Sequence, residues 1–297
     1  MIAATLLLCM LAHSAANSHA QDTHNESAAK PDTAKQSTEV ILWQGNMTEA
    51  RKAHESAVIR LALERSRDRY GPYQLSINTT QYSHPRAVRN LRDGAVAQVV
   101  TAPELAYRLD TQEQPLITIP IPLLKGLLGS RKIIIRRDRV EDFAAVHTLE
   151  QLQQFNAGLG FDWLDRDYFN QAGLPFTRGA DISQLLNMLV HGRFDYLPLG
   201  SMEAAPTLAA SEHSEQLMIL DELIIHYPFP VYVQVSRNHP TLAARLKLGL
   251  ERAQEDGSLA QLFDQHYGAF ETAVKPSRII ELQHNQQRAV NETQTLP

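Results

Sequence analysis

Cysteine is almost absent from this chain of 297 residues, which contains only Cys9. Cys9 lies in an apolar run from Ile2 to Ala12, and if that segment is removed, the remaining chain has no disulfide, no thiol nucleophile and no zinc site with cysteine ligands. Long apolar runs are missing too, because this run is too short to span a membrane and no run of spanning length follows it. The processed chain is therefore expected to be soluble.

The sequence also lacks strong charge of either sign and the common catalytic motifs. The formal net charge is −5, and lysine and arginine do not cluster, so nucleic acid is not an expected partner. There is no Gly-x-Ser-x-Gly motif, no phosphate loop and no dinucleotide fingerprint. The histidines are dispersed without a His-x-x-x-His pair, so neither a metal site nor another cofactor is predicted.

The two ends of the chain have their own patterns. Residues 1–20 carry no charged side chain and end in Ser18-His19-Ala20, a small-x-small pattern that predicts a secretory signal peptide cleaved after Ala20. The alternative is an uncleaved interfacial anchor. Residues 21–37 are polar without an apolar period, which predicts a disordered leader, and residues 273–297 are predicted to be a flexible tail.

Strand and helix patterns alternate between these ends. Buried-strand runs extend from Val40 to Trp43 and from Ala95 to Thr101, and a helical apolar period from Thr48 to Tyr70 lies between them. This alternation predicts a parallel α/β lobe. Further along the chain, Thr148 and Asp181 are predicted N-caps of helices in a second α/β lobe with its own core.

A segment rich in proline and glycine, from Ile119 to Arg137, separates the two halves. Pro120 and Pro122 fix their own backbone angles and remove two hydrogen-bond donors, so the segment cannot be helix interior or central strand. The two glycines after them permit backbone bends. We interpret this segment as a hinge crossover, with a second crossover at 226–235.

Four segments together resemble a known family. They are Ile121-Pro-Leu-Leu-Lys-Gly-Leu-Leu-Gly129, Gly192-Arg-Phe-Asp-Tyr196, His226-Tyr-Pro-Phe-Pro-Val-Tyr232 and Glu255-Asp-Gly-Ser-Leu-Ala-Gln-Leu-Phe-Asp-Gln-His-Tyr-Gly268. The sequence is similar to type 2 periplasmic solute-binding proteins of the polar amino-acid class (family 3-like), in a proteobacterial branch whose ligand is unassigned. The resemblance covers about residues 38–270.

The resemblance implies a fold and a function. The fold is α/β with two lobes, each a mixed sheet flanked by helices, and two hinge crossovers join them. Lobe I is expected to comprise 38–131 plus 233–272, and lobe II 132–232. The implied function is non-enzymatic capture of a small polar solute, an amino acid or a carboxylate, in the cleft between the lobes. The protein would be a periplasmic monomer that serves an inner-membrane permease of an ABC transporter or acts as a soluble sensor.

Two departures from the family pattern keep other functions open. Where the family reads Thr-x-x-x-Arg, this sequence reads Thr101-Ala-Pro-Glu-Leu105, and the family's acidic residue falls near Gly200-Ser201, with Glu203 the next carboxylate. Arg108 or Arg131 could replace the missing arginine. One alternative is a small-carboxylate dehydratase-like enzyme with Glu104, Asp162 or Asp195 as the general acid. The other is a degenerate binding protein with a protein partner, favoured by Leu105 and Leu199.

The candidate ligand-binding residues come mostly from strand ends, because open α/β lobes bind ligands at the carboxyl ends of strands. Trp43 is either a stacking platform or a core tryptophan, and Asp162 either borders a helix N-terminus that receives an anion or caps it. Arg131 is either an anion anchor or a solvated charge, and Asp195 either contacts ligand or fixes the hinge. The predicted set is Trp43, Gln44, Thr101, Arg131, Asp162, Trp163, Asp195 and Tyr196.

Overall fold

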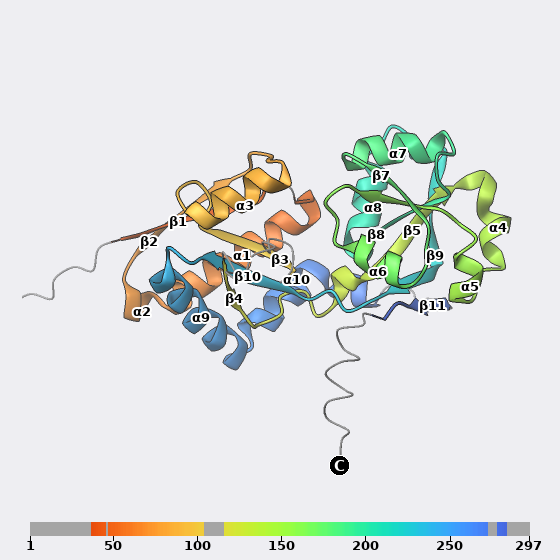
Figure 1. Cartoon of the computed structure of the whole chain (residues 1–297). Coiled ribbons are helices and arrows are strands. Elements are labelled where there is room, and N and C mark those ends of the chain that lie inside the picture. The colour runs from red at the N-terminus through yellow and green to blue at the C-terminus, as the bar shows by residue number, and fades with distance from the viewer. Residues whose placement is uncertain (1–36, 46, 104–115, 273–277, 284–297) are drawn as a thin grey trace, which may run out of the picture. The chain divides into compact units, whose positions relative to one another are not determined.

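The computed structural model describes residues 37–45, 47–103, 116–272 and 278–283, and two mixed β-sheets form its framework (Figure 1). The first, sheet A, has the order β2-β1-β3-β10-β4. Strand β1 runs parallel to β2 and β3, whereas β10 runs antiparallel to β3 and β4. The strands of sheet A are β1 (Thr38–Trp43), β2 (Tyr73–Asn78), β3 (Val99–Pro103), β4 (Leu116–Ile119) and β10 (Val231–Ser236).

The second sheet, sheet B, has the order β11-β9-β5-β8-β6-β7. Strand β5 runs antiparallel to β8 and β9, while β6 is parallel to β7 and β8, and β11 is parallel to β9. The strands of sheet B are β5 (Ser130–Arg136), β6 (Ala157–Gly160), β7 (Phe176–Gly179), β8 (Tyr196–Gly200), β9 (Leu217–His226) and β11 (Arg278–Glu281).

Helices flank both sheets. Those that belong with sheet A are α1 (Glu49–Arg65), α2 (Arg67–Tyr70), α3 (His84–Asp93), α9 (Pro240–Glu255) and α10 (Ser258–Thr272). Those that belong with sheet B are the 3-10 helices η1 (Leu127–Gly129) and η2 (Arg137–Arg139) and the α-helices α4 (Val140–Ala144), α5 (Leu149–Leu152), α6 (Asp165–Gln171), α7 (Ile182–Val190) and α8 (Ser201–Ala209). We call each sheet with its helices a lobe.

Side chains that point alternately to the two faces of sheet A form a hydrophobic core on each face. Val40 and Leu42 of β1 belong to the hydrophobic cluster that includes α1 and α9, whereas Trp43 belongs to a separate cluster with Leu91 of α3. Because successive side chains of a strand point to opposite faces, one strand serves both cores. Figure 1 shows the result, with α3 on one face of the sheet and α9 on the other.

Sheet B is buried in the same way. Ile134 of β5 packs with Leu185 and Leu189 of α7, while its neighbours Ile133 and Ile135 belong to the cluster on the other face. The predicted caps in this lobe are confirmed. The Thr148 side chain accepts a hydrogen bond in a capping box at α5, and the Asp181 side chain accepts one from the Gln184 N–H at α7.

Two crossovers connect the lobes, as predicted. The first leads from β4 to β5 and the second from β9 to β10. They run together, because the Tyr227 N–H donates to the Gly129 carbonyl at 3.1 Å and the Leu123 N–H to the Val231 carbonyl at 2.9 Å. A Cβ on Gly129 would lie 2.0 Å from the Tyr227 carbonyl oxygen, so only glycine permits this approach. The predicted two-lobe α/β fold with two mixed sheets is confirmed.

Two local predictions need correction. The tail predicted at 273–297 contains the strand β11, and the buried Ile280 of this strand and Leu282 just after it belong to the core. The sequence shows little apolar period there because β11 is a short edge strand. Strand β3 begins later than predicted and extends to Pro103. The predicted leader and the rest of the tail lie outside the described residues.

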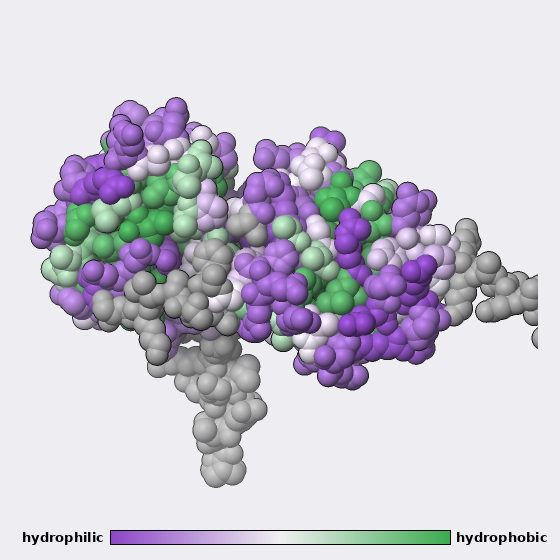
Figure 2. Space-filling model, turned by 180° about the vertical axis from the view of Figure 1, so that it is seen from behind, coloured by the Kyte–Doolittle hydropathy of each residue, from purple (hydrophilic) through white to green (hydrophobic). Residues whose placement is uncertain are grey.

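The surface is mostly polar on the face seen in Figure 2, where hydrophilic residues are spread between smaller hydrophobic patches. Large hydrophobic side chains that are exposed in the described ranges include Phe161 and Ile279. None of the helices in those ranges has the length and apolar character that a membrane span requires.

Candidate functional site

Arg131 is the centre of the strongest candidate site. It follows the first crossover as the second residue of β5, and it pairs with Gly200 of β8 on one side and with Ile225 of β9 on the other. Its side chain is only 5% exposed, so the charge needs partners within the protein. This burial excludes the alternative of a solvated strand-end charge.

Asp165 and Tyr227 supply two of these partners. Arg131 Nη2 lies 2.9 Å from Asp165 Oδ1, and Arg131 Nε donates to the Tyr227 hydroxyl oxygen at 2.8 Å. The same hydroxyl donates to Asp165 Oδ1 at 2.5 Å, which closes a buried ring of three groups. Since α6 carries Asp165 and the second crossover carries Tyr227, the ring ties Arg131 to two other elements.

Glu203 faces the third side of the guanidinium. Its Oε2 lies 4.0 Å from Arg131 Nη1, which is longer than a hydrogen bond, so this edge of the guanidinium is less engaged than the other two. Glu203 stands in the first turn of α8, where the helix dipole favours a carboxylate. Gly200 makes room for it, because a Cβ there would lie 2.7 Å from Glu203 Oε2.

The other oxygen of Glu203 connects to the sheet A lobe. The Thr48 hydroxyl donates to Glu203 Oε1 at 2.6 Å. Thr48 is the N-cap residue of α1, but its side chain makes no cap hydrogen bond because it binds Glu203. The hydrogen bond therefore joins the start of α1 to the start of α8.

A second pair of charges lies on α1 next to this contact. Arg51 Nε donates to Glu55 Oε1 at 2.7 Å, and the Thr101 hydroxyl donates to Glu55 Oε2. Glu55 is fully buried. The negative charge of Glu203 acts on both Arg51 and Glu55, so the two groups of charges form one network from α1 to α6.

The network controls the ionisation of its members. Burial raises the pKa of Glu55 to about 7, although the charge of Arg51 opposes this shift. Burial also works against the charge of Arg131, but Asp165, Tyr227 and Glu203 outweigh it and raise the pKa of the guanidinium above its usual value. Burial raises the pKa of the Tyr227 hydroxyl well above its usual value. Arg131 therefore stays cationic, whereas Glu55 changes charge near neutral pH.

The arrangement places a buried cation next to a buried carboxylate. Nη1 of Arg131 is the less engaged nitrogen, since Nε and Nη2 contact Tyr227 and Asp165, and an arginine N–H suits a carboxylate oxygen. Glu203 can accept a hydrogen bond from a cationic or neutral donor of the same solute. Within the described ranges, no group of three histidine, cysteine, aspartate or glutamate side chains could hold a metal ion.

The structure gives Trp43 and Gln44 structural partners. Trp43 is buried, its indole N–H donates to the Thr80 carbonyl at 2.9 Å, and its ring stacks on Tyr82. The Gln44 side chain donates to the Lys52 carbonyl and accepts from Ser56, both at 3.0 Å. These contacts favour the interpretation of Trp43 as a core tryptophan. Those of Gln44 attach the end of β1 to α1.

Thr101 does lie within the network, through Glu55. Asp162 does not, since its side chain is exposed and α6 begins with Leu164 as the N-cap, without a side-chain cap hydrogen bond. The predicted role of Asp162 as a cap is therefore wrong. Trp163 is half-buried, and a Cβ on Gly160 would lie 2.3 Å from its indole nitrogen, so it packs over the end of β6.

Asp195 and Tyr196 lie at the other end of β8 from Arg131. Tyr196 pairs with Ile135, while Arg131 pairs with Gly200, which separates them by four residues or about 13 Å along the strand. Asp195 accepts hydrogen bonds from the Asn156 N–H at 2.8 Å and from Arg139 at 3.1 Å. The strand that was expected to bring Asp195 and Tyr196 to the cleft approaches Arg131 with its other end, at Gly200.

Sequence reasoning missed most of the network. Arg51 and Glu55 lie in the first two turns of α1, where charged residues are expected at the surface, and Thr48 precedes them as the N-cap residue. Asp165 stands three residues after Asp162, the predicted site residue. A usable signal was the position of Thr48 and Glu203 in the helix starts that follow β1 and β8, which end at Trp43 and Gly200. Leu105, Arg108 and Glu104 lie outside the described residues.

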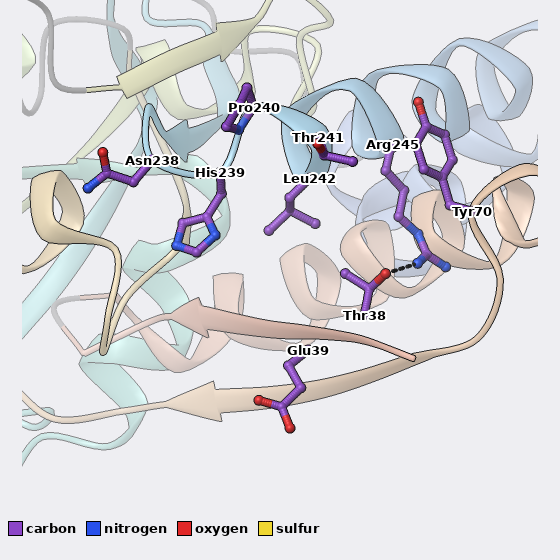
Figure 3. A pocket seen from close by; sticks show the side chains of 9 residues that line it. All are labelled: Thr38, Glu39, Tyr70, Asn238, His239, Pro240, Thr241, Leu242 and Arg245. Carbon is purple, nitrogen blue, oxygen red and sulfur yellow. Dashed lines mark hydrogen bonds between the residues drawn. The ribbon is translucent and has the colours of Figure 1, made fainter. Parts of the chain in front are cut away.

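A hollow of about 210 Å³ occurs elsewhere, near the amino end of β1 (Figure 3). Its lining includes Leu242 and the buried Arg245 of α9. Arg245 donates to the Thr38 hydroxyl and to the Gly71 carbonyl, both at 2.7 Å, so its guanidinium ties α9 to the chain around β1 and β2. We interpret this arginine as structural, and we place the candidate site at Arg131 instead.

Comparison with known proteins supports the fold. No protein-family model matches the chain, and no curated protein matches its sequence. Among solved structures, it is similar to an ancestral arginine-binding protein bound to arginine, with a TM-score of 0.53, 12% identity, and coverage of 77% of this chain and 98% of the other.

Sensor domains are equally similar. The periplasmic VFT2 domain of BvgS from Bordetella pertussis has a TM-score of 0.54 at 15% identity, and the alignment covers 77% of this chain and 92% of that domain. A histidine kinase sensor domain with similarity to periplasmic binding proteins has a TM-score of 0.53 at 13% identity, with coverage of 79% and 97%. The chain therefore has the two-lobe fold of type 2 periplasmic binding proteins.

Proposed function

We propose that this protein captures a small polar solute between its two lobes, at Arg131 and Glu203. The observation that carries the proposal is the buried network, which combines Thr48, Arg51 and Glu55 of α1 with residues around sheet B. Buried charges cost stability unless they are paired, and such clusters mark functional sites. The network lies where the two lobes meet, which is where a ligand would stabilise lobe closure.

The solute class follows from the two charged ends of the site. Arg131 is a permanent cation with an edge that is not fully bonded, so it suits an anionic group such as a carboxylate. Glu203 can receive the ammonium or another donor of the same molecule. An amino acid or a related small carboxylate is the solute that we propose, consistent with the arginine bound by one of the structural neighbours.

We further propose that the protein acts in the periplasm, without catalysis, as a monomer. Lobe I would comprise 38–131 plus 233–272 and lobe II 132–232. The bound solute would be passed to an inner-membrane permease or reported as by a soluble sensor, since structural neighbours include both a substrate-binding protein of an amino-acid ABC transporter and sensor domains. The signal peptide at residues 1–20 would direct export.

One observation favours a second candidate, a degenerate binding protein with a protein partner. The Thr48 hydroxyl already occupies Glu203, and Asp165 already occupies Arg131, so the charges are partly satisfied without any solute. A solute must compete with these contacts. A protein whose site had become purely structural would show the same pairs but would bind nothing.

Thermal-shift screening separates the two candidates. The protein would be heated with each member of a panel of amino acids, small carboxylates and polyamines. We expect at least one carboxylate-bearing compound to raise the melting temperature, because a ligand at 100 times its dissociation constant adds about 2.7 kcal/mol of stability. Sulfate at equal ionic strength is the control. A complete panel without a shift would contradict solute capture and favour the degenerate candidate.

A further inference from the structure

The carboxylate of Glu203 is shared by the two lobes. Glu203 is only 6% exposed and lies in the first turn of α8, which contacts α1 and α10 of the sheet A lobe. One carboxylate oxygen accepts from the Thr48 hydroxyl at 2.6 Å, and the other lies 4.0 Å from Arg131 Nη1. The negative charge also acts on Arg51 of α1 and on Tyr267 of α10. One side chain of the sheet B lobe is therefore held by groups of both lobes.

The hydrogen bond between Thr48 and Glu203 belongs to neither crossover. The two crossovers run together, and two adjacent connections permit rotation of the lobes about one line. Thr48 and Glu203 instead stand at the starts of α1 and α8. Because each lobe supplies one partner, this hydrogen bond joins the lobes without a covalent connection and can break when they rotate apart.

Thr48 has a second partner available within its own helix. Its backbone angles, φ −68° and ψ 151°, are the extended values typical of an N-cap residue. A threonine at this position ordinarily accepts a hydrogen bond from an N–H of the first helical turn, yet the Thr48 side chain makes no such bond. Rotation of the side chain would allow the cap bond to form once the lobes separate. The hydroxyl thus has one partner in each state.

Glu203 is also stabilised within its own lobe. The dipole of α8 favours a carboxylate in the first turn of the helix, and Arg131 lies close to it. When the lobes separate, water can donate to the oxygen that Thr48 leaves. Neither side chain then becomes a buried polar group without a partner, so the contact can break and form again at a modest cost.

We propose that Thr48 and Glu203 form a latch that holds the two lobes together when no solute is bound. In this closed state, the carboxylate of Glu203 already has a hydrogen-bond donor from the opposite lobe. A donor group of a solute would have to replace the Thr48 hydroxyl, so the latch competes with capture. This consequence rests on the proposed function, whereas the latch itself requires no solute.

The strength of the latch is the difference between two hydrogen bonds. Removal of the Thr48 hydroxyl takes the bond to a charged group from the closed state and the weaker cap bond from the open state. We expect this removal to lower the ratio of closed to open molecules by about 2- to 30-fold.

The test removes the hydroxyl and measures lobe separation without any solute. Thr48→Val deletes the donor and keeps the branched shape, whereas Thr48→Ser keeps a hydroxyl. Thr241→Val is the matched control, because Thr241 is exposed on α9 and lines the hollow near the amino end of β1. Spin labels on Arg89→Cys of α3 and Ser183→Cys of α7, both exposed positions, report distances by double electron-electron resonance in a Cys9→Ser background.

We expect Thr48→Val to enlarge the population at longer label distances, while Thr48→Ser and Thr241→Val keep the distribution of the parent. Thr48→Ala, a second deletion of the hydroxyl, should give the same shift, and urea midpoints show that each variant is folded. An unchanged distribution in both deletion variants, or an equal change in Thr48→Ser or Thr241→Val, would overturn the latch. Since no solute is used, a failed ligand screen leaves this result unaffected.

Discussion

Replacing Arg131 by methionine should lower the free energy of unfolding by about 3–5 kcal/mol, as found when one partner of a buried ion pair is removed. The variant leaves Asp165 buried without its cation, and it also removes the hydrogen bond from Arg131 Nε to the Tyr227 hydroxyl. Methionine preserves much of the side-chain volume, so the loss reports charge and hydrogen bonding more than packing. Urea unfolding at neutral pH measures it.

A double variant separates the pair from its surroundings. Arg131→Met combined with Asp165→Asn removes both charges, and we expect it to recover part of the stability that Arg131→Met loses. Lys132→Met is the matched control, because Lys132 is the next residue of β5 and its ion pair with Asp221 is partly exposed. If Arg131→Met and Lys132→Met cost the same, the buried network would not be the source of the effect.

The second large effect concerns pH, because two neighbouring residues of α1 titrate in opposite senses. His54 is buried and neither ring nitrogen has a hydrogen-bond partner among the described residues. Burial, with additional effects of His266 and Arg51, lowers the pKa of His54 from 6.5 to about 3. Burial raises the pKa of Glu55 from 4.5 to about 7.

The sign of each contribution follows from proton binding. Between pH 6.5 and 3 the unfolded chain protonates His54 and the folded chain does not, so stability falls as the pH is lowered through this window. Between pH 4.5 and 7 the folded chain keeps a proton on Glu55 that the unfolded chain loses, so stability falls as the pH is raised through that window. One pKa unit corresponds to about 1.4 kcal/mol, so each window spans several kcal/mol.

Single variants should therefore change the pH dependence of the free energy of unfolding in opposite directions. His54→Phe should gain stability relative to the parent as the pH falls below 6.5, and Glu55→Gln should gain relative to the parent as the pH rises above 4.5. Urea unfolding measured at intervals from pH 4 to pH 8 gives both profiles. Parallel profiles for parent and variants would show that neither group is buried as described.

The sequence predicted the fold well because the fold depends on local signals. Alternating strand and helix periods, the caps at Thr148 and Asp181, and the proline-rich crossover are all confirmed in place. These signals are read within a few residues of the chain. The strand β11 was missed because an edge strand of four residues offers too short a pattern.

The site was predicted less well because it depends on pairing over long distances in the sequence. Arg131 was identified from its place after the crossover, but its partners Asp165 and Tyr227 are far away in sequence. For Tyr196, the sequence shows that the residue lies on a strand. It does not show which end of that strand approaches Arg131, because this depends on the antiparallel register with β5.

At Thr48, a hydrogen bond to a residue distant in sequence takes the place of the local cap hydrogen bond. Its residue type and position predict an N-cap, and it does occupy the N-cap position of α1, yet its hydroxyl binds Glu203 of the other lobe. A cap hydrogen bond contributes about 1 kcal/mol, and a hydrogen bond to a charged group contributes about 1.5–3 kcal/mol. The carboxylate is therefore the stronger partner.

The most direct test of solute capture at this site is titration calorimetry with the compound that gives the largest thermal shift. Glu203→Gln keeps the side-chain shape and can still accept from Thr48, but it removes the charge. We expect it to weaken binding by about 10- to 100-fold, the loss of one charge-assisted hydrogen bond. Glu141→Gln, at an exposed position of α4, should bind as the parent does. Equal affinity in all three proteins would show that the solute binds elsewhere.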